Sequence, residues 1–144
     1  MYTERATEKM EPLAIMPPDD HGPGTHNSAY LSTSKHSRHL LVLDVGDCAA
    51  GATIDAGIQQ ASDSAGTGVK AISGKTITQL AQADGDTPAK VAIELRGEEL
   101  DVNGSYVRFY VTTAGATVIF GATLYGVEPK TKPVDTANWD EIVD

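Results

Sequence analysis

The sequence predicts an all-β fold: an antiparallel β-sandwich or jelly-roll-like domain with extended arms at both ends of the chain. The first observation is the alternation of apolar and polar side chains in residues 91–125, where Gly-containing links separate the runs. In the run 106–111, for example, Val107, Phe109 and Val111 fall on one face. Strict period-2 runs rich in Val, Ile, Tyr and Phe are typical of antiparallel strands with one buried face.

The second observation is the number and spacing of such runs. Residues 39–45 form a dense apolar run, which suggests a strand that is buried on both faces. Residues 53–60 alternate, and residues 69–72 and 76–80 form shorter, weaker runs. About seven strands at short, regular spacing predict a sandwich or a jelly roll.

Two glycine positions carry specific expectations. Asn103-Gly104 is a sequence typical of a hairpin turn between two strands. Gly121 lies in the middle of the last apolar run, where a glycine often marks a bulge or the close approach of another backbone. Replacement of Gly121 by Val should therefore damage the fold.

Residues 1–37 are predicted to form an extended N-terminal arm outside the folded unit. Four prolines between residues 12 and 23 prevent a long helix, and the remainder is mostly polar. Such a segment buries too little apolar surface to offset the entropy of ordering it. It is either disordered or an arm that orders against a partner, and Leu13, Ile15 and Met16 are its candidate partner contacts.

The β-sandwich domain is predicted to span residues 38–127, and residues 128–144 to form an extended C-terminal tail. The tail begins with a Pro-rich stretch, which cannot pair in a central strand because proline lacks the backbone donor. Trp139 is the only Trp of the chain, and Ile142 lies close to it in the sequence. We expect both to anchor the tail, either on the parent domain or on a neighbouring molecule.

The composition excludes several classes of partner. A net charge of −9 argues against a nucleic-acid-binding face, because phosphate recognition needs clustered Lys and Arg. The single cysteine, Cys48, excludes an intrachain disulfide framework and fits maturation in a reducing cytoplasm. No apolar run approaches the roughly 20 residues of a membrane span, and residues 1–16 lack the apolar stretch of a signal peptide. We expect no nucleic-acid partner, no membrane association and no secretion.

Catalytic and ligand-binding motifs are weak. The Gly-Lys-Thr at residues 74–76 ends like a phosphate-binding loop, but Val69 stands where that loop requires glycine. His21 and His26 lie near two aspartates in a Pro/Gly segment without a zinc-binding spacing, so a solvated loop is the favoured interpretation. No sequence-adjacent cation activates Cys48, and no nucleophile elbow is present. The sequence therefore predicts no enzyme activity, no cofactor and no metal.

One polar face of the predicted sheet is a candidate binding surface. Tyr106, Arg108 and Tyr110 alternate with the apolar residues of the same run and should share a face. This face could contact another subunit, a second sheet or a ligand. We favour a subunit contact.

A collinear series of short segments extends through residues 38–126. It comprises Val45-Gly46, AGATID (50–55), QQASD (59–63), GTGVKAI (66–72), GKTITQL (74–80) and EELDV (98–102). This series resembles a family of small virion proteins of tailed bacteriophages and prophages. Members of that family are similar in size, are commonly encoded among capsid and structural genes, and are regarded as structural. The N-terminal arm and the tail with Trp139 fall outside the resemblance.

The resemblance implies a virion structural protein, and the arm–core–arm layout favours a capsid decoration (cement) protein. Such a protein binds the outer head shell and stabilises it by bridging capsid subunits. The expected partners are the major capsid protein and further copies of this chain, with a homotrimer matching a threefold axis of the shell. The expected location is the capsid surface, after synthesis in the bacterial cytoplasm. The alternatives are a receptor- or glycan-binding module of a tail or fibre and a head–tail joining protein.

Overall fold

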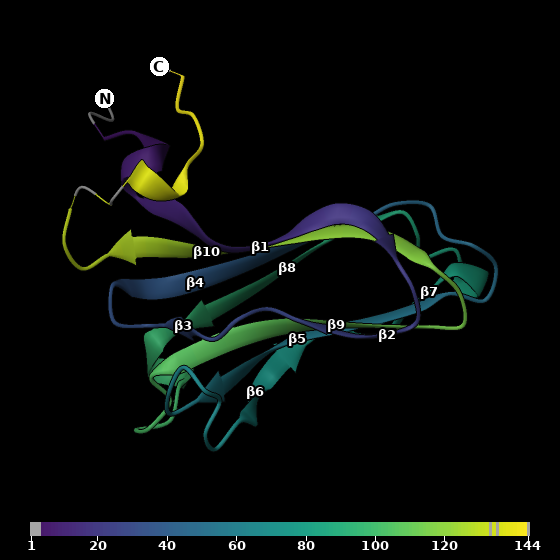
Figure 1. Ribbon diagram of the computed structural model, residues 1–144, viewed down its shortest axis with the longest axis horizontal. Helices are drawn as coiled ribbons and strands as arrows, with labels where there is room; N and C mark the ends of the chain where they lie inside the picture. The colour runs from purple at the N-terminus through teal and green to yellow at the C-terminus, as the bar shows by residue number, and fades with distance from the viewer. Residues whose placement is uncertain (1–3, 133, 135, 144) are drawn as a thin grey trace.

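The computed structural model describes residues 4–132, 134 and 136–143, and this part of the chain is built mainly of β-strands (Figure 1). Two antiparallel sheets pack against each other with the apolar core between them. The predicted all-β sandwich is confirmed.

Each sheet is named here by its strands, in the order in which they are hydrogen-bonded. Sheet A contains β1 (Met10–His21), β10 (Val118–Pro129), β4 (His36–Val45) and β8 (Ala89–Arg96). Sheet B contains β2 (Gly24–Asn27), β9 (Tyr106–Ala114), β5 (Thr53–Ala61) and β6 (Lys70–Thr76). Two short strands extend sheet B: β3 (Leu31–Ser32) pairs with β9, and β7 (Leu80–Ala81) pairs with β5. Short 3-10 helices are η1 (Ala6–Glu8), η2 (Gln82–Asp84), η3 (Gly97–Glu99) and η4 (Thr136–Asn138).

The strand order is that of a jelly roll. The chain passes repeatedly from one sheet to the other, as in the steps from β1 to β2, from β4 to β5 and from β8 through β9 to β10. The resulting orders, β1-β10-β4-β8 and β2-β9-β5-β6, pair strands that are mostly distant in sequence, as in the eight-stranded double Greek key. The hairpin predicted at Asn103-Gly104 is therefore wrong, because this link joins β8 and β9, which lie in different sheets.

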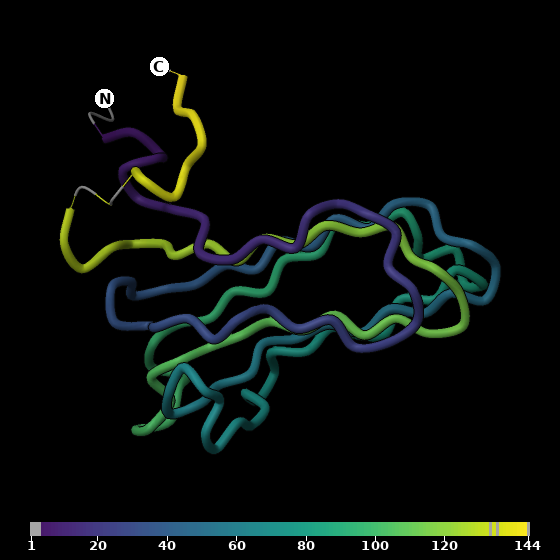
Figure 2. Tube along the Cα trace, viewed as in Figure 1, coloured from purple at the N-terminus to yellow at the C-terminus, as the bar shows by residue number. Residues whose placement is uncertain are grey.

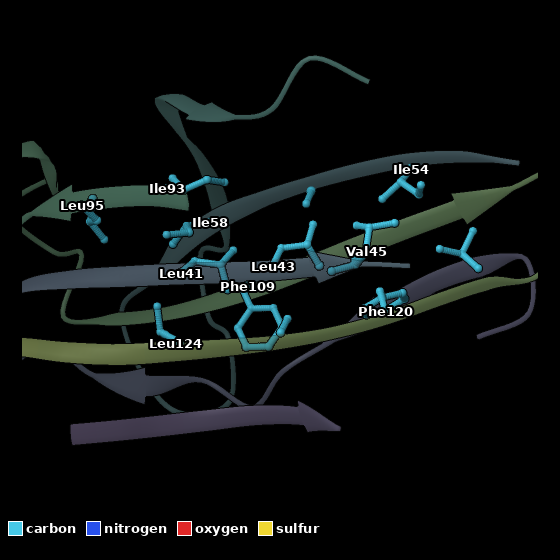
Figure 3. Close-up of a cluster of buried hydrophobic side chains, with 14 of the residues drawn as sticks. Leu41, Leu43, Val45, Ile54, Ile58, Ile93, Leu95, Phe109, Phe120 and Leu124 are labelled. Carbon is cyan, nitrogen blue, oxygen red and sulfur yellow. The ribbon is translucent and has the colours of Figure 1, made fainter. Parts of the chain in front are cut away.

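The core lies between the two sheets and follows the alternation of the sequence. Large side chains from both sheets meet in its centre (Figure 3): Leu41, Leu43, Val45, Ile54, Ile58, Ile93, Leu95, Phe109, Phe120 and Leu124. The inward face predicted for the run 106–111 is confirmed, since Val107, Phe109 and Val111 are buried. The expectation that residues 39–45 are buried on both faces is wrong, because the outward Leu40 and Val42 remain half-buried.

The N-terminal segment is part of the sandwich, so the prediction of an arm at residues 1–37 is wrong for β1, β2 and β3. Figure 2 shows the chain of β1 running alongside that of β10. The prolines fit because β1 is an edge strand, where a missing backbone donor on the unpaired side breaks no ladder. Pro17 and Pro18 also fall within a register shift between Met16 and Asp19. Prolines that exclude a central strand are compatible with this edge.

Candidate functional site

The inner face of sheet A changes from apolar to polar at the end where η1 and η4 lie (Figure 1). Strand pairing places Glu11 of β1 opposite Gly126 of β10, and Gly126 opposite His39 of β4. Glu11 is only 4% exposed and His39 only 1% exposed, so both side chains are enclosed. A carboxylate and an imidazole occupy this row, whereas the next inward row carries Leu124 and Leu41.

Gly126 makes room for a third polar side chain. A Cβ on Gly126 would lie 2.5 Å from Nδ1 of His36, so the His36 ring occupies the space that any larger residue would fill. From this position His36 Nε2 lies 2.9 Å from Glu11 Oε1, and His36 is 3% exposed. Glu11, His36 and His39 together are called the Glu–His cluster below.

Burial dominates the electrostatics of the cluster. Desolvation lowers the pKa of His36, and it outweighs the opposing attraction of the Glu11 carboxylate. Desolvation also lowers the pKa of His39 to about 4, and repulsion from His36 and Lys130 acts in the same direction. Both rings are therefore neutral at pH 7 in the folded protein. Neither ring nitrogen of His39 has a hydrogen-bond partner within the described ranges.

The C-terminal tail packs over this end of the sandwich. Asn138 in η4 donates a hydrogen bond to Glu11 Oε2 at 2.9 Å. The rings of Trp139 and Tyr125 lie with their centroids 6.3 Å apart, and Val134 is buried. Of the two positions expected for the Trp139 anchor, the structure has the one on the parent domain.

A cavity of about 310 Å³ lies beside the cluster. It is lined by Glu11 and His36 together with Lys35, Lys130 and several uncharged residues from the segments on either side. The chemistry of this arrangement is proton uptake by enclosed imidazoles near one carboxylate and two ammonium groups. Its members come from three separate segments, so neither their spacing nor any local motif marked them in the sequence.

Tyr106, Arg108 and Tyr110 share the outer face of sheet B, as the alternation predicted, and all three are half-buried. The Arg108 guanidinium lies 4.8 Å from the centre of the Tyr30 ring, and its Nε donates a hydrogen bond to Gln59 at 2.9 Å. The face is therefore held in place by contacts within the chain.

The three apolar candidates of the N-terminal segment do not form one patch. Ile15 is 61% exposed on the outer face of sheet A, whereas Met16 packs against the core, because neighbouring residues of a strand point to opposite faces. Leu13 is half-buried at a register shift of β1. In the tail, Ile142 is half-buried beside a shallow hollow that includes Ala6 of η1.

The remaining motifs have structural contacts. Lys75 of the Gly-Lys-Thr motif donates a hydrogen bond to the backbone carbonyl of Glu94 at 2.7 Å and pairs with Glu99 at 2.9 Å. Within the described residues, no group of three or more His, Cys, Asp or Glu is arranged to hold a metal ion. The described helices are all too short or too polar to cross a membrane.

No protein-family model matches the sequence, and no curated protein matches it. The fold defines the class of protein, a small jelly-roll sandwich. A jelly roll supports many functions, so a function for this chain has to be argued from its surfaces.

Proposed function

We propose that this chain is a bacteriophage virion structural protein, a capsid decoration (cement) protein that binds the outer head shell and bridges capsid subunits. The proposal starts from the resemblance of residues 38–126 to small virion proteins of tailed phages. The observation that carries it is the outer face of sheet A. The centre of this surface is apolar, and the exposed Glu94, Asp44 and Lys90 lie around it. A broad sheet face of this kind suits a large protein partner better than a small molecule.

Strand pairing gives the composition of this face. One row across the sheet consists of Ile15, Thr123, Val42 and Ala92. The next row places Tyr125 opposite Leu40. Ile15 and Ala92 are exposed, and the others are half-buried. Burying these side chains against a partner would remove apolar surface from water, which is the main favourable term in protein association.

The charged residues near this face pair mainly with one another. Arg38 Nη1 lies 3.3 Å from Glu94 Oε1, and Arg38 Nε lies 3.2 Å from Glu128 Oε2. Lys90 Nζ lies 3.8 Å from Asp44 Oδ1. An apolar centre with a polar rim is the usual anatomy of a protein interface. In this proposal the outer face of sheet A meets the capsid protein. The outer face of sheet B, with Tyr106, Arg108 and Tyr110, meets further copies of the chain, in a trimer that matches the symmetry of the shell.

A receptor- or glycan-binding module is the second candidate. The observation in its favour is the outer face of sheet B, where Tyr30 and Arg108 stack beside Tyr106 and Tyr110. Aromatic rings next to hydrogen-bonding side chains can supply the apolar body and polar tip that an amphipathic ligand needs. Binding to a defined set of glycans on an array, lost in Tyr110→Ala, would favour this second function.

Sedimentation with phage heads tests the first proposal. The heads are those of a tailed phage that encodes this chain, prepared without it. We expect the full chain to sediment with them, and Ile15→Glu to weaken binding by about tenfold or more, because it places a charge in the apolar centre. The matched control is Val102→Glu: Val102 is 100% exposed in the link between η3 and β9, so binding should be unchanged. Failure of the unmodified chain to bind heads, or equal binding by Ile15→Glu, contradicts the proposal.

A further inference from the structure

The Glu–His cluster ties the beginning of the domain to its end. Glu11 uses one carboxylate oxygen for His36 and the other for Asn138 in the tail. A second contact joins the N-terminal and C-terminal segments, since Lys132 Nζ lies 2.6 Å from Glu4 Oε1. Figure 1 shows η1 and the C-terminal segment next to each other at this end, beyond the sheets. Through Glu11, strand β1 therefore contacts both strand β4 and the tail.

The charges around the cluster do not favour added protons. Glu11 from β1 is the one carboxylate in contact with the rings within the described residues. Lys35, from the link before β4, and Lys130, from the segment after β10, are cations that repel a protonated ring. The ring centroids of His36 and His39 lie 6.0 Å apart, and the two rings repel each other when both are charged. β8 contributes the apolar Leu95 opposite His39.

We propose that the Glu–His cluster is a pH-operated clasp, which holds the C-terminal tail on the domain at neutral pH and releases it in mild acid. Asn138 of the tail bonds to Glu11, Glu11 contacts His36, and Val134 of the tail lines the same cavity as His36. When the tail leaves, water reaches this end of the sandwich, and the histidines can take up protons without the cost of burial. The clasp is a property of the isolated chain and does not depend on a role in a virion.

The direction of the pH effect follows from the histidines. Burial lowers the pKa of His36 and of His39 in the closed state, whereas a solvated histidine has its ordinary pKa of about 6.5. Below that value the open state binds more protons than the closed state. A fall in pH therefore shifts the equilibrium toward the open state.

Trp139 provides a direct readout, because it is the only Trp of the chain and lies in the tail. In the full-length protein we expect its fluorescence emission to move to longer wavelength as the pH is lowered from about 7.5 to about 5. The far-UV circular dichroism of the sheets should stay constant over this range, because the middle rows of the core are apolar. Constant emission of Trp139, or a simultaneous loss of the sheet signal, overturns the proposal.

Variants locate the protons. The double variant His36→Gln/His39→Leu should keep the tail in place down to about pH 5, and the matched control His26→Gln, at the other end of the sandwich, should release it as the unmodified protein does. Release of the tail by the double variant at the same midpoint pH as in the unmodified protein overturns the clasp.

A second variant, Asn138→Ala, keeps the test decisive if the double variant does not fold. Asn138 is exposed, and loss of its bond to Glu11 should move release to a higher pH. An unchanged midpoint in Asn138→Ala also contradicts the proposal.

Discussion

Two pairs of histidines occupy opposite ends of the sandwich, and their surroundings differ. At the end of β1, His21 stacks on Phe120 with ring centroids 3.9 Å apart, and His26 meets His21 edge-on at 5.0 Å. Both of these rings are half-buried. At the beginning of β1, His36 and His39 are enclosed in the Glu–His cluster.

The difference shows that the packing at a strand end, and not the residue type, decides whether a histidine packs as an apolar ring or contacts a carboxylate. At the end with His21, the large Phe120 fills the inner face and the imidazole packs on it as a flat ring. At the other end, Gly126 leaves that inner face empty and a histidine from the next strand fills it. Only this second arrangement places an imidazole within 2.9 Å of a buried carboxylate.

The largest expected effect comes from closing the space that Gly126 leaves. In Gly126→Ala the new Cβ would overlap the His36 ring, so His36 must move away from Glu11. We expect a loss of about 2–3 kcal/mol in the free energy of unfolding, measured by urea denaturation. The matched control is Gly22→Ala at the opposite end, where nothing lies within 4 Å of the added Cβ, so the change should stay below about 0.5 kcal/mol. Equal stabilities of the two variants would show that the two ends are packed alike.

The second effect is a dependence of stability on pH. The unfolded chain protonates His39 below a pKa of about 6.5, whereas the folded protein does so only below a pKa of about 4. As long as the tail stays closed, the unfolded state therefore binds more protons between these values, and stability falls as the pH falls, by up to about 2–3 kcal/mol from His39 across this window. Release of the tail lets the folded protein take up protons as well, so the slope becomes smaller below the pH of release. Urea denaturation at a series of pH values measures the slope. His39→Leu should flatten it, and His26→Gln should not. An unchanged slope in His39→Leu would place the pH dependence elsewhere.

The sequence could predict faces but not neighbours. The period of two along β9 and β10 fixes which side chains point inward, whatever strand lies beside them. The period does not say which strand lies beside it. Local turn rules therefore could not predict that β8 and β9 lie in different sheets. The prolines of β1 were misinterpreted for the same reason. They are breakers by local rules, and only the pairing with β10 makes them residues of an edge strand.

The two candidate sites also differ in whether the sequence could predict them. Tyr106, Arg108 and Tyr110 could be placed on one face because they belong to a single alternating run. The Glu–His cluster could not be found, since Glu11 and His36 come from a segment predicted as an arm. Gly126 is the second glycine of β10, but a glycine within a strand does not say which side chain fills the space beside it.

The smallest expected effect concerns Gly121, which makes a similar close contact in the more open half of β10. A Cβ there would lie 3.1–3.2 Å from atoms of Pro18, opposite the register shift of β1, so the close approach expected from the sequence is present. Gly121→Val should cost about 1–2 kcal/mol, less than Gly126→Ala, because Pro18 lies in an exposed edge strand that can shift outward. The matched control Thr123→Val, at the next outward position of β10, adds no such contact and should change stability by less than about 0.5 kcal/mol. A cost for Gly121→Val as large as that for Gly126→Ala would mean that β1 is held equally firmly along its whole length. The Glu–His cluster would then be one of several fixed points and not the one that sets the position of the strand.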